Sequence, residues 1–522
     1  MNKFLHTLLV LFVLLLLLVP VPVYAHAFGQ RYDLPIPLSY FMAGAAATVA
    51  LSFVVIGLFL RGGSAAYRYP RLNLLALPLP GVRLTSRIKA MVARVLSVLL
   101  FALVFAATLF GSDNPLENIA PTFIWIIWWV GLGYISALFG NLWMLMNPWK
   151  ALFEFAEWLL QRAGAGMPKP RPYPEGWDML PALFTFLIFV WLENVYPAAI
   201  VPAHLAVIIV LYSVYTFGGM VLFGKHVWLR YGDPFSVLFG IFARFSPTEV
   251  RVVRADCAGC KSDKSSGSVD ENRDTRGFAD GDGCVDCYEY FERAEPERQQ
   301  FNLRPWAVGL VPAGRVSWQA CAFVVLALAA VSFDGLQETT NWLAVQTIGL
   351  RLLGPGGVSV VDTLGVVLIP LLFLGIYLLF CIGIRSLGGE RESVTEVARA
   401  YVYSLVPIAL AYNMAHFLSL LLVQGQLIIP LASDPFGFGW DIFGTAGYRI
   451  DPTVISTKFA WIVSIAAIVV GHIVSVYIAH TIALRRAPSH KLALRGQYPM
   501  LALMVFYTAV SLWIISQPIM VE

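Results

Sequence analysis

The chain has 522 residues, of which 58% are hydrophobic and only 13% are charged. Soluble domains carry roughly a quarter charged residues, so this composition excludes an ordinary soluble protein. The formal net charge of +4 gives no sign of a nucleic-acid partner. Apolar runs of about 20 residues, the length that crosses the hydrocarbon core of a bilayer, recur along the sequence. The sequence therefore predicts an all-α polytopic membrane protein in contact with the lipid bilayer.

The first apolar run has the features of a removed signal peptide. Lys3 precedes the apolar stretch LLVLFVLLLLLVPV, and Val23 and Ala25 occupy positions −3 and −1 of a small-residue cleavage site. We expect residues 1–25 to be cleaved off, which leaves His26 as the first residue of the mature protein. An uncleaved first helix is the alternative.

Ten further apolar segments predict transmembrane helices. They lie at residues 38–60, 93–110, 121–145, 180–200, 203–224, 318–336, 361–384, 400–424, 456–484 and 498–517. They divide the mature chain into an N-terminal bundle of five helices (26–224), a polar loop (225–305) and a C-terminal bundle of five helices (306–522).

The charges of the connecting loops predict the side of the membrane on which each loop lies. Basic segments such as KHVWLR and RRAPSHKLALR alternate with acidic or neutral ones such as GSDNPLEN and LASDPFGFGWD. Because basic loops stay in the cytoplasm, both ends of the mature chain are expected outside it. This arrangement is that of a multi-pass protein of the bacterial inner membrane with periplasmic termini and a cytoplasmic loop 225–305.

That loop carries two C-x-x-C pairs, formed by Cys257 and Cys260 and by Cys284 and Cys287. Two such pairs about two dozen residues apart suit one tetrahedral Zn²⁺, and disulfides are uncommon in the cytoplasm. Because the protein would supply all four ligands, we interpret the pairs as a structural zinc site. An iron site and free or redox-active thiols are the alternatives.

Two aromatic-rich segments suit the membrane surface better than its interior. YGDPFSVLFGIFARFSP is too short to span, and NPWKALFEFAEWLLQRAG is amphipathic. We expect both segments to lie at the cytoplasmic interface. For the first segment, partial re-entry into the membrane is the alternative.

Ionisable side chains inside spans are costly, so each is a functional candidate. At 1.5 Å per residue, His416 and His472 fall near mid-membrane on consecutive helices, and Asn413 shares a face with His416. We expect these three to form one site, with Glu193 or Asp334 within reach. Such a set suits a divalent metal or a proton relay. For a single histidine, a hydrogen bond that ties two helices is the alternative.

Three other histidines are weaker candidates. An N-terminal His26 offers its α-amine and ring Nδ1 to a metal such as Cu²⁺, and His204 near the outer face could complete that site. The alternative is a residue that the signal peptidase merely tolerates. His480 lies nearer to a pair of arginines, and we expect it at the interface.

Several segments of the membrane part resemble a family of bacterial integral-membrane proteins named fenitrothion hydrolase. The resemblance lies in HAFGQRYDLPIPLSYFMAGAAATVALSFVV, VWLENVYP, VSFDGL, LAYNMAHFLSLLLVQGQ and PFGFGWDIFGTAGYRID…GHIVSVYIAH, and excludes the cysteine-rich loop. It implies a membrane-bound organophosphorus hydrolase that cleaves a P–O–aryl bond of a hydrophobic small molecule. It also implies a second, related membrane subunit as a partner.

Hydrolysis of a phosphotriester needs an activated water and a Lewis acid, and one bound metal ion supplies both. We expect His416, His472, Glu193 and Asp334 to bind such a divalent metal, with Asn413 orienting the water. No standard hydrolase motif supports this chemistry. One alternative function is a transporter or channel that uses the same residues. The other is a non-catalytic membrane subunit or assembly factor whose cysteine-rich loop binds a cytoplasmic partner.

Overall fold

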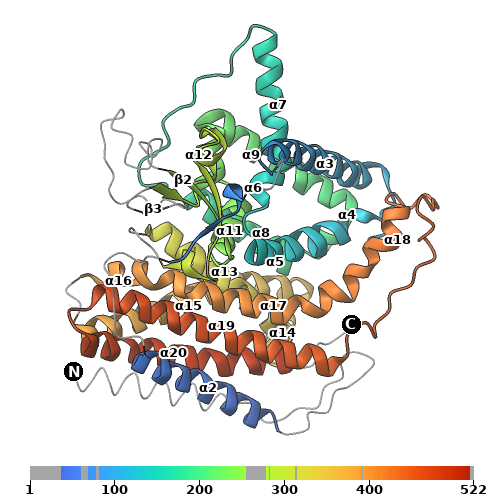
Figure 1. Cartoon of the computed structure of the whole chain (residues 1–522). Helices are drawn as coiled ribbons and strands as arrows, with labels where there is room; N and C mark the ends of the chain where they lie inside the picture. The colour runs from blue at the N-terminus through green and yellow to red at the C-terminus, as the bar shows by residue number, and fades with distance from the viewer. Residues whose placement is uncertain are drawn as a thin grey trace.

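The computed structural model describes residues 37–59, 69–77, 82–253, 278–280, 283–311, 314, 316–389 and 392–517. The expected signal peptide, His26, Cys257 and Cys260 lie outside these residues. The chain forms a bundle of long helices with a small antiparallel sheet toward one end and α18 at the other (Figure 1). We name these the sheet end and the α18 end.

Within the described residues, nine helical stretches are long and apolar enough to cross a membrane, which confirms the polytopic all-α prediction. Five are essentially single helices: α2 (Leu38–Phe59), α9 (Pro202–Phe223), α13 (Trp318–Gln337), α19 (Thr457–Arg486) and α20 (His490–Ser516). A sixth is the apolar part, Ala90–Phe110, of α3 (Val82–Phe110). The other three stretches are composite. Ile119–Phe139 joins α4 (Ile119–Thr122), the π-helix η2 (Phe123–Gly131) and α5 (Leu132–Phe139). Thr340–Gly388 joins α14 (Thr340–Leu353), η7 (Gly354–Gly356) and α15 (Gly357–Gly388), and Val394–Leu422 joins α16 (Val394–Tyr401), η8 (Val402–Leu405) and α17 (Val406–Leu422).

The span expected at 180–200 differs from the others. It is the apolar helix α8 (Leu180–Asn194), which is 15 residues long, followed by the short 3₁₀ turn η3 (Pro197–Ile200). At 1.5 Å per residue α8 covers about 22 Å, less than the hydrocarbon core. Its last residues, Glu193 and Asn194, lie at the wall of a cavity.

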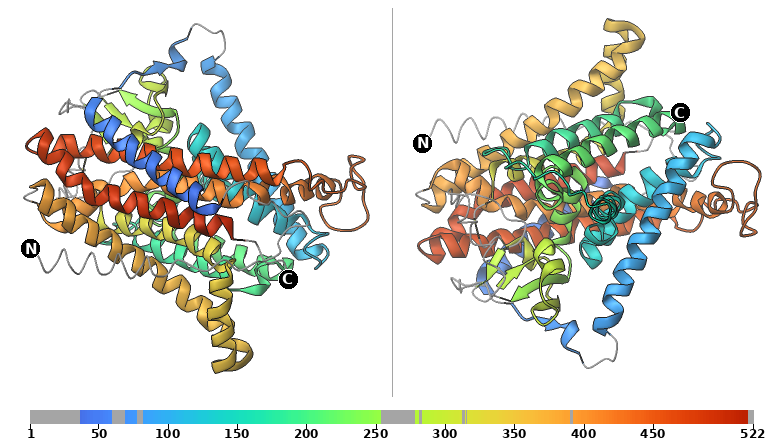
Figure 2. Two further views of the ribbon diagram at one scale, coloured as in Figure 1. Left: turned by 90° about the horizontal axis from the view of Figure 1, so that it is seen from below. Right: turned by 90° about the horizontal axis from the view of Figure 1, so that it is seen from above.

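Helix α13 lies at the centre of the bundle and packs against α8, α15 and α17. Helix α17 in turn packs against α19, where a Cβ atom at Gly471 would lie only 2.4 Å from Cβ of Ala411. Small residues permit such close approach of helices in a membrane. Helix α2 packs against α19 and α20, far from its neighbours in sequence (Figures 1 and 2).

The sheet has the strand order β1-β5-β2-β4-β3, and all of its pairs are antiparallel. Its strands are β1 (Leu72–Asn73), β2 (Thr248–Val253), β3 (Phe278–Asp280), β4 (Gly283–Val285) and β5 (Gln299–Leu303). The sequence reading did not anticipate this sheet. It joins the loop after α2 to the segment after α11, which α12 (Tyr288–Arg293) also covers.

A buried ion network holds the sheet together. Arg304 places Nη1 3.2 Å from Glu249 and 2.9 Å from Asp286, and Arg71 binds Glu249 at 2.7 Å. The side chains of Arg304 and Glu249 are fully buried. Burial raises the pKa of Asp286, and the nearby Arg304 guanidinium opposes that rise. Each charge is thus compensated by a partner, as burial requires.

The structure records Cys284 and Cys287 as a disulfide, with their Cα atoms 6.0 Å apart. The expected zinc site needs Cys257 and Cys260 in addition, and these lie outside the described residues. The four-thiolate zinc site therefore stays a prediction.

The segment expected at the interface, YGDPFSVLFGIFARFSP, forms α11 (Pro234–Ala243), after the short helix α10 (Lys225–Tyr231). Every residue of α11 except Gly240 is buried, and the helix packs against α5 and α8. The helix is enclosed by protein, and its expected place at the cytoplasmic interface, or partly re-entering the membrane, stays a prediction. After α6 (Trp143–Met146), the amphipathic segment forms α7 (Pro148–Arg162), which exposes Phe155, Trp158 and Leu159.

We predict that Glu249→Ala destabilises the sheet by roughly 3–5 kcal/mol, because it leaves the buried Arg304 guanidinium with Asp286 as its remaining carboxylate. Thermal unfolding in detergent, followed by limited proteolysis of the sheet, measures the effect. Glu295→Ala is the control, since Glu295 is 68% exposed and forms an ion pair with the neighbouring Arg298. Equal melting of the two variants would contradict a structural role for the network.

Candidate functional site

Two neighbouring hollows that share lining residues lie inside the bundle. The outer cavity, at the α18 end, has a volume of about 1000 Å³, and the inner chamber has about 30 Å³. Glu193, Asp334 and Phe417 line both of them. The inner chamber has room for about two water molecules. Leu238 and Phe242 of α11 are among its lining residues.

The outer cavity is strongly acidic. Four carboxylates line it, those of Glu193, Asp334, Glu338 and Asp362. His416 is the one basic side chain among its lining residues within the described chain. Its remaining wall is largely apolar and aromatic, with Trp125 and Tyr196 among its members.

Asp334 of α13 and His416 of α17 form the central contact of the site. His416 Nε2 lies 2.9 Å from Asp334 Oδ2, and the two side chains are 11% and 23% exposed. The sequence reading expected a carboxylate within reach of His416, and Asp334 fills that place. The pair is partly open to the cavity, so water or a ligand can reach it.

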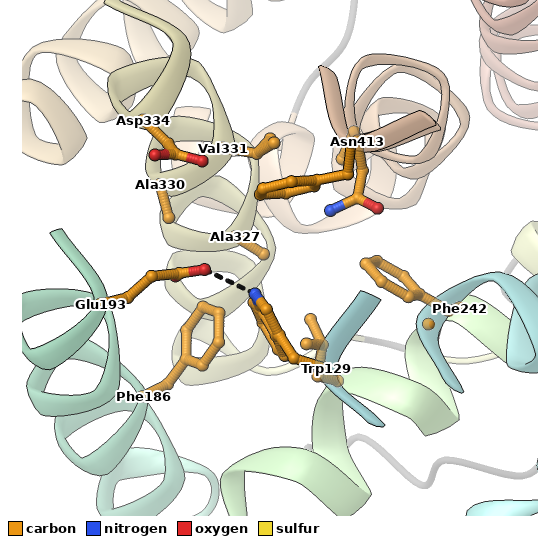
Figure 3. Close-up of a pocket in the computed structure, with 13 residues that line it drawn as sticks. Trp129, Phe186, Glu193, Phe242, Ala327, Ala330, Val331, Asp334 and Asn413 are labelled. Atoms are coloured by element: carbon orange, nitrogen blue, oxygen red, sulfur yellow. Dashed lines mark hydrogen bonds between the residues drawn. The ribbon is translucent and has the colours of Figure 1, made fainter. Parts of the chain in front are cut away.

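Glu193 accepts a hydrogen bond of 2.6 Å from Trp129 Nε1. Figure 3 shows Glu193 and Asp334 directed into the same space from α8 and α13, with Asn413 of α17 facing it as well. Trp129 belongs to the π-helix η2, and so does Trp125, whose Nε1 donates to the carbonyl of Ala199. π-Helical turns occur frequently at functional sites. Here the segment supplies one indole to each hollow.

A four-residue segment of α13, Ser332–Gly335, organises the neighbouring helices. Ser332 Oγ lies 2.5 Å from the hydroxyl of Tyr507, and Asp334 binds His416. Gly335 makes room for Tyr412, because a Cβ atom there would lie 2.4 Å from the Tyr412 hydroxyl oxygen. The segment thus fixes α17 and α20 around the site.

The sequence reading missed two of the carboxylates. Asp362 is 6% exposed and accepts hydrogen bonds from Trp342 Nε1 at 2.8 Å and Gln346 Nε2 at 2.9 Å. Glu338 follows directly on α13. Both residues lie at the ends of expected spans, where charged side chains are common and do not indicate a site. Only an excess of acidic residues at one end of the bundle could have indicated them.

The structure separates His472 from His416, contrary to the expected shared site. Ser464 Oγ donates to the carbonyl of Ala415, so His416 is level with Ser464 on α19. His472 lies eight residues further along α19, about 12 Å away along the axis. Its Nδ1 is 2.8 Å from the carbonyl oxygen of Ile468, and it lines neither hollow.

Of the other candidate histidines, His204 and His480 are described by the structure, and neither lines the two hollows. His204 is exposed, with Nδ1 2.6 Å from the hydroxyl of Tyr196, while its expected partner His26 lies outside the described residues. His480 was expected at the interface, but it is fully buried, with Nδ1 3.0 Å from Gln497 Oε1.

Among the described residues, no three His, Cys, Asp or Glu side chains gather as a metal site. His416 and Asp334 form a pair, and the other expected ligand, His472, lies elsewhere. The described part of the chain therefore offers an acid–base pair rather than a preformed metal centre.

No family model, no curated protein and no solved structure matches this chain. The chain is a multi-span membrane protein, and its function must be argued from the site.

We predict that Gly335→Ala lowers stability by about 1–3 kcal/mol and disturbs the site, because the new methyl group overlaps the Tyr412 hydroxyl. The shift of the thermal midpoint in detergent measures this. Gly375→Ala on α15 is the matched control, since no atom lies within 4 Å of the added Cβ there. If the two variants melt alike, Tyr412 does not depend on the space at Gly335.

Proposed function

We propose that the protein is a proton-coupled membrane carrier that takes a hydrophobic organic cation into the outer cavity. The observation that carries this proposal is the acidic cavity itself, where four carboxylates face one histidine. Two of these carboxylates, Glu193 and Asp334, also reach the inner chamber and so stand where a ligand would pass deeper.

Electrostatics favour a cation at this place. Carboxylates that share a cavity in a medium of low dielectric constant repel each other, and a proton or a bound cation relieves the repulsion. A cation that binds beside Glu193 and Asp334 would therefore displace protons from the site. Exchange of this kind is the physical basis of proton coupling.

The size and wall of the cavity indicate the class of cation. A volume of about 1000 Å³ exceeds the needs of a metal ion and suits a drug-sized molecule. Trp125, Tyr196 and Phe417 offer aromatic faces, which attract organic cations by cation–π interaction. An aromatic cation can thus bury apolar surface and place its charge near Asp334.

The charges of the loops support an outward-facing cavity. Basic loops are expected in the cytoplasm. The segment LASDPFGFGWD is neutral to acidic. It begins within α18 (Ile428–Ser433), which follows the short 3₁₀ turn η9 (Gln424–Leu427). On this topology the outer cavity opens to the periplasm, and the sheet with its proposed zinc site lies in the cytoplasm.

A second candidate is the hydrolase that the fenitrothion hydrolase resemblance implies. The contact between Asp334 and His416 favours it, because a carboxylate that orients an imidazole is a general-base arrangement for activating water. The surrounding acidic groups oppose it, because the transition state of phosphotriester hydrolysis gains negative charge. We therefore place it second.

We predict that the protein in nanodiscs binds tetraphenylphosphonium, and that Asp334→Asn and Glu193→Gln each weaken binding at least about tenfold. The reason is that a unit charge in a partly buried site contributes more than about 1.4 kcal/mol to binding a cation. Binding should also weaken as pH falls, because protons compete for the same carboxylates. Equilibrium dialysis against empty nanodiscs measures the affinity.

Asp113→Asn is the matched control, since Asp113 is an exposed carboxylate at the α18 end that does not line the cavity. Triphenylphosphine oxide, a neutral aromatic molecule, tests the role of charge. Equal binding of the cation and the neutral molecule, or equal loss in all variants, would contradict the proposal.

The hydrolase candidate predicts turnover of a nitrophenyl phosphotriester by the reconstituted protein. His416→Ala should then abolish the release of nitrophenolate, because the base is lost, and Asp113→Asn should leave it unchanged. Sensitivity to a chelator would add a metal to the mechanism. Release at the rate of empty liposomes would remove this candidate.

A further inference from the structure

A second group of polar side chains lies deeper in the bundle, beside the site but outside both hollows. It consists of Ser332 of α13, Tyr412 of α17, His472 of α19, and Tyr507 and Ser511 of α20. Each of the five is less than a tenth exposed. Polar groups this far inside a membrane protein need hydrogen-bond partners.

These side chains are neighbours. The Tyr507 hydroxyl lies 2.5 Å from Ser332 Oγ, and the ring centroids of Tyr507 and His472 are 5.9 Å apart. The Tyr412 hydroxyl lies against Gly335, three residues after Ser332 on the same face of α13. Ser511 follows Tyr507 by one turn of α20.

Three buried polar atoms of this group have no hydrogen-bond partner anywhere in the described residues. They are the hydroxyl oxygens of Tyr412 and Ser511 and Nε2 of His472. Leaving each unpaired costs roughly 1–3 kcal/mol, and native proteins satisfy nearly all such atoms with protein or water.

The Tyr412 hydroxyl and His472 Nε2 have complementary hydrogen-bonding roles. His472 Nδ1 lies 2.8 Å from the carbonyl oxygen of Ile468, so it must carry the proton and donate. In the neutral ring, Nε2 is then an acceptor. The Tyr412 hydroxyl is a donor without an acceptor. A water molecule can accept from the hydroxyl and donate to the ring nitrogen.

We propose that bound water occupies this place between α13, α17 and α19 and completes the hydrogen bonds of Tyr412 and His472. The water site lies close to the outer cavity, because the rings of Tyr412 and His416 stack with centroids 6.3 Å apart. His416 and Tyr412 also contact adjacent residues of α13, Asp334 and Gly335.

The hydration site deepens the proposed function. A hydrogen-bonded chain from Asp334 and His416 past Tyr412 to His472 would carry a proton from the outer cavity towards the interior of the bundle. The proton-transfer role rests on the proposed function as a proton-coupled carrier. The presence of bound water does not depend on that function, and X-ray radiolysis tests the water alone.

X-ray radiolysis generates hydroxyl radicals from water in place, and these modify side chains beside bound water even where bulk solvent is excluded. We expect Tyr412 and Tyr507 of the purified protein to be modified several-fold faster than Tyr377. Tyr377 is the matched control because it is 2% exposed and its hydroxyl donates to the carbonyl of Ala398 at 2.7 Å. Mass spectrometry of peptides gives the three rates from one sample.

The variant Tyr412→Phe removes one partner of the water and should lower the modification of Tyr507 towards the rate of Tyr377. The variant Tyr377→Phe should leave Tyr507 unchanged. Rates for Tyr412 and Tyr507 as slow as that of Tyr377 in the unaltered protein would overturn the proposal. Fast modification together with absence of cation binding would keep the hydration site and remove the carrier function.

Discussion

The hydrogen bond between Asp334 and His416 sets the arrangement of the helices around the site. Each side chain is ionisable and lies where the membrane would otherwise leave it without a partner, so each depends on the other. The contact fixes α13 against α17, and Gly335 beside it admits the ring of Tyr412. The cavity at the α18 end and the buried polar group both adjoin this contact.

The two ends of the bundle treat charge differently. At the sheet end, Glu249 and Arg304 are fully buried and bound to each other, so this network stabilises the fold and excludes ligands. At the α18 end, the carboxylates of Glu193 and Asp334 face a hollow and outnumber the cationic groups there. The first arrangement is that of a structural element, and the second is that of a binding site.

Much of the fold follows from the sequence because a bilayer demands long apolar helices. The same demand singled out Glu193, Asp334, Asn413 and His416, and these line the two hollows. The depth of His472 could not be predicted, because counting residues from the ends of spans assumes straight helices that start level. The span that contains α17 includes the 3₁₀ turn η8, and α19 is 30 residues long, so these two spans do not meet that condition. The sheet was missed because its strands pair residues far apart in the sequence, such as Leu72 with Leu303 and Glu249 with Asn302.

The number of protons released when a cation binds tests the account most directly. Isothermal titration of the purified protein with tetraphenylphosphonium, in two buffers of different ionisation enthalpy, gives that number. Proton coupling predicts release of about one proton per bound cation near neutral pH, and loss of that release when Glu193 and Asp334 are both replaced by their amides. Binding with the same heat in both buffers would show that no proton leaves the site, and would contradict proton coupling.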